Sequence, residues 1–497
     1  MSWPEERGDW MPYLEEAALD APPARKAGAI FGVILAWLVI VCAVAFIVYR
    51  VNVQAPAPEA GTDHSDAKNL VVIRMQGMYL VGAYNWAGRK DKQYSEIAAT
   101  LNVGPPAQRL CAIVLLGEIG DAAEARMELS ELADQWQKEK TPLTEQQLRA
   151  LHILQTLYND FVENRFDAPS LSEADRKALV EELGWFGELA LVPPGTARTS
   201  ERATVLAPAY RTVVVLVVFI LVFGVLFLAG SVGLLALPIC ALLGYLRGSL
   251  RDNVPRAGVY AETFALWLVF FLGLSWLGSW AAHQFDVKPW HMLLSGMGML
   301  LSLGVLLWPV LRGIPWRQVK RDIGWTAGRA EAAEPLFGLG TFVLSIPLLV
   351  VGLLATLLLM ALSQSLHPAD PGTEQPGHPV FELLQNAKWW EIAQAFFAAS
   401  IVAPIVEETM FRGVLYRQLR SATAGGGFVS SFLGSMVIVS FLFAVIHPQG
   451  WVATPALMAI AFALTIAREW RVSLLPGMVH HGVHNACLLA LALVLLN

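Results

Sequence analysis

Two adjacent glutamates, Glu407 and Glu408, lie in the largely apolar segment APIVEETMFRGVLYRQLR. A charged side chain in a membrane span costs about 2.5–3.5 kcal/mol on insertion scales, so such a residue usually has a function. On a helix the two side chains are about 100° apart, which predicts that they face different partners. Glu408 and Arg412 have the i, i+4 spacing of an ion pair, with the acid first. We therefore expect Glu408 to be structural and Glu407 to be a free carboxylate that can act as a general base.

A histidine, His447, ends the next apolar segment, SFLFAVIHP, and Phe443 precedes it by one helical turn. A single histidine at the end of a span is more often an interfacial residue than a catalytic one. A catalytic role for His447 is therefore supported only by the other motifs in the sequence.

The last apolar segment contains MVHHGVHNACLL, with His480, His481, His484 and Asn485. The i, i+4 spacing places His481 and Asn485 on one helix face, and it does the same for His480 and His484. Three histidines within five residues of a lipid-embedded helix are hard to explain by packing alone. We interpret this segment as part of a site.

These residues could converge on one water-filled cavity. Glu407 and His447 would bind and deprotonate a water molecule. His481 and Asn485 would donate hydrogen bonds to the oxyanion of a tetrahedral intermediate, a contribution often worth several kcal/mol. The chemistry would be hydrolysis of an amide bond without a covalent intermediate.

The composition requires that such a site lie in a membrane protein. Of the 497 residues, 55% are hydrophobic and 15% are charged, whereas a soluble protein carries about a quarter charged residues. The formal net charge of -6 provides no basic surface, so nucleic acid is not expected as a partner. The four cysteines lie far apart and read as small buried hydrophobes.

Hydropathy and composition divide the chain into six segments. We expect an all-α fold, a polytopic bundle of about nine or ten transmembrane helices with an inserted soluble helical domain. The segments are a poorly ordered N-terminus (1–26), a transmembrane anchor (27–49), an Ala/Pro-rich linker (50–69), a soluble helical domain (70–208), transmembrane helices (212–382) and a membrane-embedded core (383–497).

The soluble segment has the marks of a helical bundle and no catalytic motif. Asp121 and Thr144 each begin a capping-box spacing, and Ser172 begins a helix that we expect to run towards Leu191. A protein partner for residues 70–208 is the hypothesis that its context suggests.

The membrane segments fix an orientation except at one point. After the anchor they are expected at 213–246, 262–280, 291–311, 335–362, 390–419, 431–447, 451–467 and 473–496. The loops 247–256, 312–329, 417–420 and 468–471 are basic, while 283–289 and 363–388 are almost free of positive charge. The positive-inside rule puts the first group in the cytoplasm.

The exception is 213–246, which is long for one span and could turn at Ala229-Gly230-Ser231 into a hairpin. A hairpin would put the soluble domain in the cytoplasm, and a single span would put it outside.

Three motifs in this order resemble those of the CPBP family, which groups the CAAX prenyl endopeptidases with Abi-type, bacteriocin-processing membrane proteins. They are EETMFR (Glu407 to Arg412), FxxxH (Phe443 to His447) and HxxxN (His481 to Asn485), and the resemblance covers about 391–496. Each motif alone is loose, but all three in order on apolar helices are specific.

The resemblance implies an all-helical intramembrane endopeptidase whose site opens towards the cytosol. Glu407 and His447 would activate the water, and His481 and Asn485 would form the oxyanion hole. Glu408, Arg412 and Phe443 would support them. This mechanism requires no cofactor.

Zinc is the alternative, because two further histidines accompany the family pattern. A shell of Glu407, His447, His481 and His484 has the neutral imidazoles and carboxylate of a catalytic zinc site.

Other functions are a non-catalytic scaffold or bacteriocin-immunity-type protein, and a proton-coupled transporter. A transporter should often show internal repeats, and we find none. A degenerate scaffold would have lost a motif residue, and none is lost. We expect a multi-pass protein of a cell inner membrane whose partners are the lipid bilayer and a membrane protein or lipidated peptide substrate.

Overall fold

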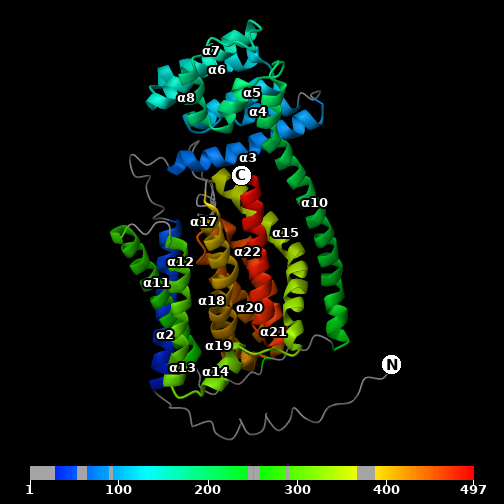
Figure 1. The fold of residues 1–497 in the computed structure, drawn as a ribbon. Helices are drawn as coiled ribbons and strands as arrows, with labels where there is room; N and C mark the ends of the chain where they lie inside the picture. Colours follow the sequence, from blue (N-terminus) through cyan, green and yellow to red (C-terminus); the bar gives the residue numbers. More distant parts are fainter. Residues whose placement is uncertain are drawn as a thin grey trace. The chain divides into compact units, whose positions relative to one another are not determined.

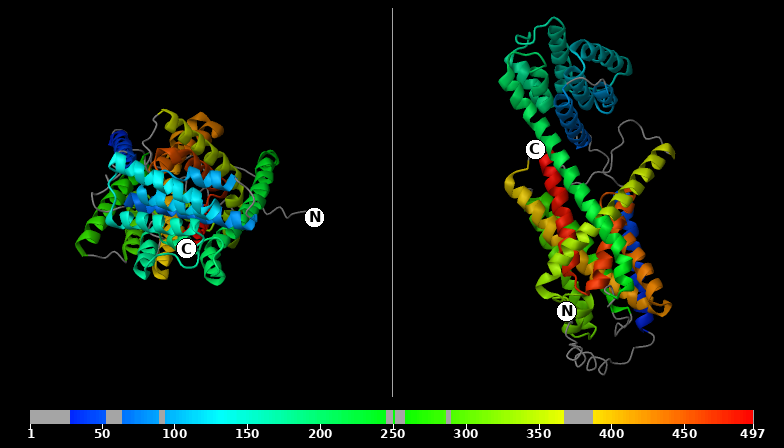
Figure 2. Two further views of the ribbon diagram at one scale, coloured as in Figure 1. Left: turned by 90° about the horizontal axis from the view of Figure 1, so that it is seen from above. Right: turned by 90° about the vertical axis from the view of Figure 1, so that its right-hand side faces the viewer.

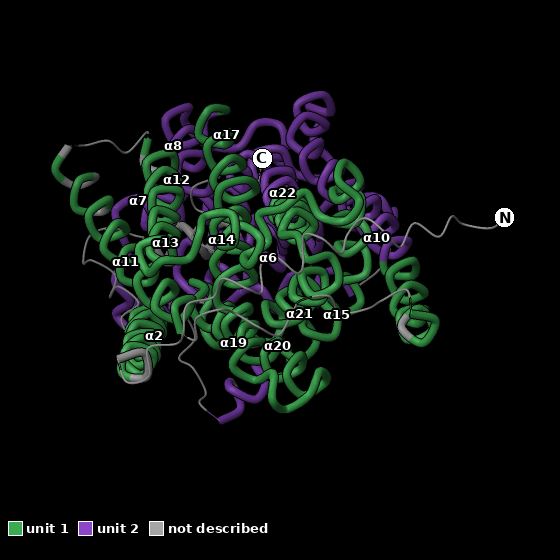
Figure 3. Tube along the Cα trace, turned by 90° about the horizontal axis from the view of Figure 1, so that it is seen from below, with its two compact units in different colours: residues 1–54, 227–358, 389–487 green, residues 55–226, 359–388, 488–497 purple. Residues whose placement is uncertain are grey.

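The computed structural model describes residues 28–52, 64–88, 93–244, 250, 258–285, 290–366 and 387–496. Within them the secondary structure is helical and without strands, as the sequence predicts (Figure 1). Contacts divide the chain into two compact units (Figure 3). Unit 1 comprises 1–54, 227–358 and 389–487, and unit 2 comprises 55–226, 359–388 and 488–497. The expected disordered N-terminus at 1–26 lies outside the described residues.

Unit 2 is a stack of short helices with a common apolar core, and its last helix continues into unit 1. Its helices are α3 (His64–Trp86), α4 (Gln93–Thr100), α5 (Pro106–Ile119), α6 (Ala122–Glu139), α7 (Glu145–Val162), α8 (Glu173–Leu183), α9 (Trp185–Leu191) and the first part of α10 (Thr199–Leu242). Because α3 begins at His64, the linker expected over 50–69 is too long by at least six residues. Residues 53–63 are outside the described part.

The helix starts of unit 2 follow the predicted caps. Asp121 Oδ1 accepts the amide N–H of Glu124 at 2.8 Å, and Thr144 forms a reciprocal capping box with Gln147. The helix expected from Ser172 to Leu191 is instead two helices, because Gly184 at φ +55° ends α8. That backbone conformation suits glycine and stops a helix.

A buried ion pair fixes the start of α10 within unit 2. Arg202 donates from Nη1 and Nη2 to the two carboxylate oxygens of Glu118 on α5, at 3.0 and 2.5 Å. Arg202 also donates to the carbonyl oxygen of Val192 at 2.6 Å. A bidentate pair of this kind sets direction as well as position.

Unit 1 contains the membrane helices. With the short helices that connect them, they are α2 (Gly28–Asn52), the rest of α10, α11 (Val259–Phe285), α12 (His291–Ser302), η3 (Leu303–Leu306), α13 (Leu307–Leu311), α14 (Trp316–Ile323), η4 (Glu331–Ala333), α15 (Glu334–Leu366), α17 (Trp389–Phe397), η5 (Ala398–Val402), α18 (Ala403–Glu407), η6 (Glu408–Leu415), α19 (Tyr416–Ala422), η7 (Ala424–Gly426), α20 (Phe428–Val445), η8 (Trp451–Ala453), α21 (Thr454–Arg471) and α22 (Leu475–Leu496). The last residues of α15, after Leu358, and of α22, after Cys487, are assigned to unit 2. Nine helical stretches of the described chain are long and apolar enough to cross a membrane.

One helix settles the open point at 213–246. α10 runs without a break from Thr199 to Leu242, through Ala229-Gly230-Ser231 (Figures 1 and 2). The hairpin alternative is therefore wrong, and the single-span alternative stands. Gly230 packs against α15 instead of turning the chain, since a Cβ there would lie 2.3 Å from the carbonyl oxygen of Val343.

A continuous α10 predicts that residues 64–198 lie on the non-cytoplasmic side. The side chain of Lys177 on α8 is 77% exposed, so a Lys177→Cys variant should react with a membrane-impermeant maleimide on intact cells. The physical reason is that one span separates this domain from the basic loop 247–256. Labelling that requires permeabilised cells would contradict the prediction.

Four arginines that the sequence counts as loop charges are buried in unit 1. Arg420 pairs with Glu469 at 3.1 Å, and Arg471 pairs with Glu334 at 2.6 Å. Arg417 lies 4.0 Å from Asp322, and Arg468 donates to backbone carbonyls. They join α14, α15, α19 and α21 at one end of the bundle. Burial raises the pKa of Asp322, an effect that Arg417 opposes.

Candidate active site

The segment that carries the glutamates is not a regular α-helix. Between Trp389 and Ala422 it contains two π-helical stretches, η5 at Ala398–Val402 and η6 at Glu408–Leu415. Such wide turns occur often at functional sites. Glu407 is the last residue of α18 and Glu408 is the first of η6, so the second π-helical stretch begins between the two carboxylates.

Both carboxylates face one imidazole ring, that of His481 on α22. His481 Nδ1 lies 3.0 Å from Glu408 Oε1, and His481 Nε2 lies 3.8 Å from Glu407 Oε2. The expectation that the two glutamates cannot share a partner is therefore wrong. An imidazole has two nitrogens on different edges, so it can lie between two side chains that diverge from one helix.

Glu408 and Arg412 form the expected pair in a fully buried position. Arg412 Nη1 donates to Glu408 Oε1 at 3.0 Å, and both side chains are 0% exposed. The Arg412 guanidinium also lies 4.3 Å from the centroid of the Phe443 ring, at the distance of a cation–π contact. Glu408 Oε1 thus accepts from Arg412 and from His481 at once, which fixes the orientation of the histidine.

His447 completes the polar cluster from the end of α20. Its Nδ1 is hydrogen-bonded to the carbonyl oxygen of Phe443. A carbonyl only accepts, so Nδ1 carries the proton and Nε2 of the neutral ring is a lone-pair acceptor. That Nε2 lies 3.7 Å from Glu407 Oε2. The ring centroids of Phe443 and His447 are 4.3 Å apart, so the phenylalanine holds the imidazole in place.

Asn485 lies one turn beyond His481, where its amide meets the π-helical stretch η5. Asn485 Nδ2 donates to the carbonyl oxygen of Ala399 at 2.7 Å. Gly482 allows this close approach, because a Cβ there would lie 2.5 Å from the carbonyl oxygen of Ser400. The amide nitrogen has a second N–H that this bond leaves available.

An unsatisfied acceptor marks the centre of the cluster. Glu407 Oε2 is buried and has no hydrogen-bond partner, although His447 Nε2 and His481 Nε2 flank it at 3.7 and 3.8 Å. These separations exceed hydrogen-bonding range and correspond to polar groups that a shared water molecule joins. The side chains of Glu407 and His447 are each 18% exposed, so the cluster is accessible at its edge. This arrangement can hold and polarise one water.

The other two histidines of α22 belong to a different environment. The rings of His480 and His484 lie 5.9 and 6.5 Å from the ring of Phe342 on α15. Within the described residues, no group of three or more His, Cys, Asp and Glu side chains has the arrangement of a metal site. The zinc shell of Glu407, His447, His481 and His484 thus gains no support from this geometry and stays an alternative prediction from the sequence.

His480 predicts a stabilising substitution. The side chain is 0% exposed, and neither ring nitrogen has a hydrogen-bond partner. Leaving a buried polar group unsatisfied costs about 1–3 kcal/mol, so His480→Leu should raise the unfolding temperature in detergent and leave intact the hydrolytic activity that the sequence leads us to expect. His481→Leu is the matched control, because it removes a ring that both carboxylates contact. Loss of activity in His480→Leu alone would assign it a function.

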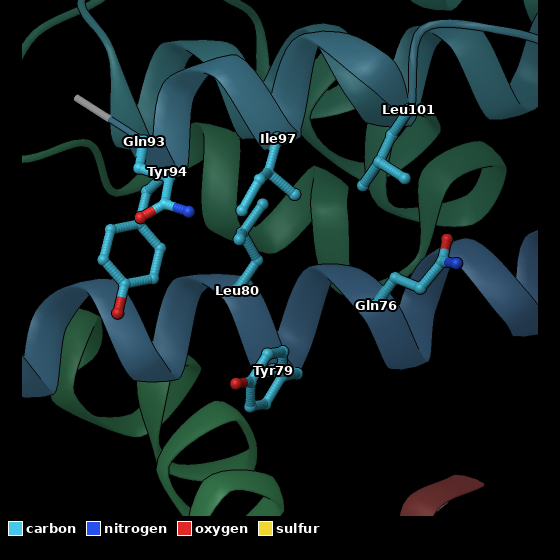
Figure 4. Close-up of a pocket in the computed structure, with 7 residues that line it drawn as sticks. All are labelled: Gln76, Tyr79, Leu80, Gln93, Tyr94, Ile97 and Leu101. Atoms are coloured by element: carbon cyan, nitrogen blue, oxygen red, sulfur yellow. The ribbon is translucent and has the colours of Figure 1, made fainter. Parts of the chain in front are cut away.

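Unit 2 contains a hollow whose lining residues differ in type from those of the polar cluster. It is lined by Gln76, Tyr79 and Leu80 of α3 and by Gln93, Tyr94, Ile97 and Leu101 of the chain at α4 (Figure 4). Leu80 and Ile97 point towards each other across it. None of the seven lining residues is a histidine or a carboxylate, so the hollow offers no acid–base pair.

Sequence reasoning missed the double contact of His481 and the participation of backbone carbonyls. The carbonyl oxygens of Phe443 and Ala399 set the orientation of His447 and Asn485. The i, i+4 spacing of Phe443 and His447 was the available signal for the first. No residue type predicts the second, because it depends on the π-helical course of η5.

Comparison with known proteins gives one family match. The family model described as type II CAAX prenyl endopeptidase Rce1-like matches residues 389–487. The match begins at the start of α17 and ends within α22, so it contains every residue of the polar cluster. No curated protein matches the chain, and no solved structure does.

Proposed function

Residues 389–487 match an Rce1-like domain, which is consistent with the CPBP family. From this premise we propose that the protein is an intramembrane endopeptidase. It hydrolyses peptide bonds of membrane-associated proteins or peptides with a water that Glu407 and His447 activate. One observation carries the proposal. The buried Glu407 Oε2 has no hydrogen-bond partner and lies 3.7 Å from His447 Nε2.

The nucleophile is a water between these two groups. Because Nδ1 of His447 is committed to the Phe443 carbonyl, both Nε2 and Glu407 Oε2 accept protons from the same water. The water's oxygen then attacks the scissile carbonyl as a proton passes to the carboxylate, which returns it to the leaving amine. No covalent intermediate forms.

The oxyanion is held by His481 and Asn485. A water has two protons to donate, so three acceptors around it cannot all be satisfied, and one of them must carry a proton. His481 takes this role, because Glu408 Oε1 beside its Nδ1 stabilises the imidazolium. Nε2 then donates to the oxyanion, as does the second N–H of Asn485. One such donor contributes about 10²–10³-fold to kcat.

This mechanism has no step that requires a metal or another cofactor. The substrate is a membrane protein or a lipidated peptide, reached from the bilayer of a cell inner membrane. Nucleic acid has no place in it, and unit 2 offers a surface for a protein partner.

Comparative proteomics of protein N-termini tests the function. Membranes are prepared from cells that express the wild type, Glu407→Gln or Glu173→Gln, which alters an exposed acid at the start of α8. We expect a set of N-termini in the wild type and in Glu173→Gln that is absent in Glu407→Gln at equal expression. Identical sets in all three strains would refute an endopeptidase.

A further inference from the structure

We infer that the active site opens to the non-cytoplasmic face of the membrane, and that its substrates present the scissile bond on that face. The inference rests on the proposed function and adds a substrate class to it. It differs from the cytosolic opening that the family resemblance implies.

Several contacts define one end of unit 1, called here the basic end. Gly258, just before α11, lies against Val33 near the start of α2, so closely that a Cβ would meet its Cγ2 at 2.0 Å. Glu262 pairs with Arg312 at 3.1 Å. The starts of α2 and α11 and the end of α13 therefore lie together. Arg25 and Lys26 precede this end of α2 in the sequence.

Other contacts define the opposite end, called here the far end. The amide N–H of Trp451 donates to Oδ1 of Asn52, the last residue of α2, at 2.9 Å. The amide N–H of Leu293, near the start of α12, donates to Gln394 Oε1 on α17 at 3.2 Å. A helix of 25 residues such as α2 is about 37 Å long, so the two ends lie on opposite sides of the hydrocarbon core.

The catalytic histidine belongs to the far end. His447 follows the last residue of α20, Val445, by two residues, and it precedes Trp451 by four. The turn between α20 and η8 therefore connects the active site directly to the position where α2 leaves the membrane. Pro448 in this turn is exposed.

Burial along the glutamate helix gives the same direction independently. From Glu408 to Arg420, towards the basic end, every residue is buried. From Glu407 back towards α17, buried residues alternate with partly exposed ones, among them Ser400 and Ala403. Packed protein side chains thus separate Glu407 from the basic end, whereas the helix towards α17 is less closely covered by protein.

The charges assign the two ends to the two faces. Arg417, Arg420, Arg468 and Arg471 are buried and do not count as free loop charges. In the sequence, the segments that precede or connect the helices of the basic end still contain Arg25 and Lys26, three arginines in 247–256, and Arg312, Arg317, Lys320, Arg321 and Arg329. The short segments at the far end have Arg50, Lys288 and Lys388. The positive-inside rule places the basic end in the cytoplasm and the active site at the outer face.

A substrate class follows from this orientation. The enzyme acts on the non-cytoplasmic part of a membrane protein, or on a peptide that has already crossed the membrane.

Cysteine labelling tests the opening without a substrate. In the starting protein Cys42, Cys240 and Cys487 are replaced by Ala and the buried Cys111 is kept. The labelling of this protein, without an introduced cysteine, gives the background. Pro448→Cys should react with a membrane-impermeant maleimide on intact cells, whereas Arg317→Cys, exposed on α14, should react only after permeabilisation. Reaction of Pro448→Cys only in permeabilised cells, or of Arg317→Cys in intact cells, would overturn the inference.

The labelling result and the proposed function can fail separately. Labelling needs no catalysis, so it stands if Glu407→Gln leaves all N-termini unchanged. Where cleavage is detected, the sites lost in Glu407→Gln should lie in non-cytoplasmic segments of their proteins. Sites in cytoplasmic segments would overturn the inference while leaving the endopeptidase in place.

Discussion

Glu407→Gln is expected to lower kcat/KM for peptide hydrolysis by about 10²–10⁴-fold, the usual contribution of a general base. Glutamine keeps the length and shape of the side chain, but its amide cannot take a proton from the water beside His447 Nε2. The measurement is cleavage of a peptide, identified from its new N-terminus, by purified protein in detergent. Substrate binding should change much less than turnover.

Two comparisons make this result specific. Glu407→Gln should unfold at nearly the wild-type temperature, because the carboxylate is 18% exposed and has no ion pair with an arginine. Residues that act as one unit are strongly non-additive. Glu407→Gln combined with His447→Gln should therefore lose little more activity than either single variant. A fully additive loss would show that the two residues do not share one water.

The sequence indicated which polar side chains of the membrane segments would come together, but it did not indicate their mutual arrangement. Ionisable side chains on apolar helices are conspicuous, and i, i+4 spacing paired Glu408 with Arg412 correctly. Helical phase failed for Glu407 and Glu408 because it assumes a regular helix and a partner with one contact point. The π-helical stretch and the two nitrogens of His481 violate both assumptions.

The fold shows the same division between local and long-range information. Hydropathy located the spans, and caps at Asp121 and Thr144 located helix starts, because both signals are local. The sequence left open whether 213–246 is a single span or a hairpin, since a glycine in an apolar helix can mark either a turn or a close contact with another helix. The approach of Gly230 to α15 decides it, and only tertiary packing provides that information.

Arg412→Met is expected to destabilise unit 1 by about 3–5 kcal/mol, the usual effect of removing one partner of a buried ion pair. Glu408, which is 0% exposed, would then lose its arginine partner and keep only its contact with His481 Nδ1. Glu408→Gln should have a similar effect for the complementary reason. The measurement is the unfolding temperature of the detergent-solubilised protein, with Arg317→Met on the exposed surface as the matched control.

The double variant Glu408→Leu/Arg412→Leu separates stability from catalysis. An apolar pair can replace a buried ion pair at little cost or with a gain, so the double variant should unfold at a higher temperature than either single variant. It should nevertheless remain inactive, because His481 Nδ1 loses the carboxylate that orients its ring. Recovery of activity together with stability would mean that the pair acts only as packing, and that His481 does not depend on Glu408 for its orientation.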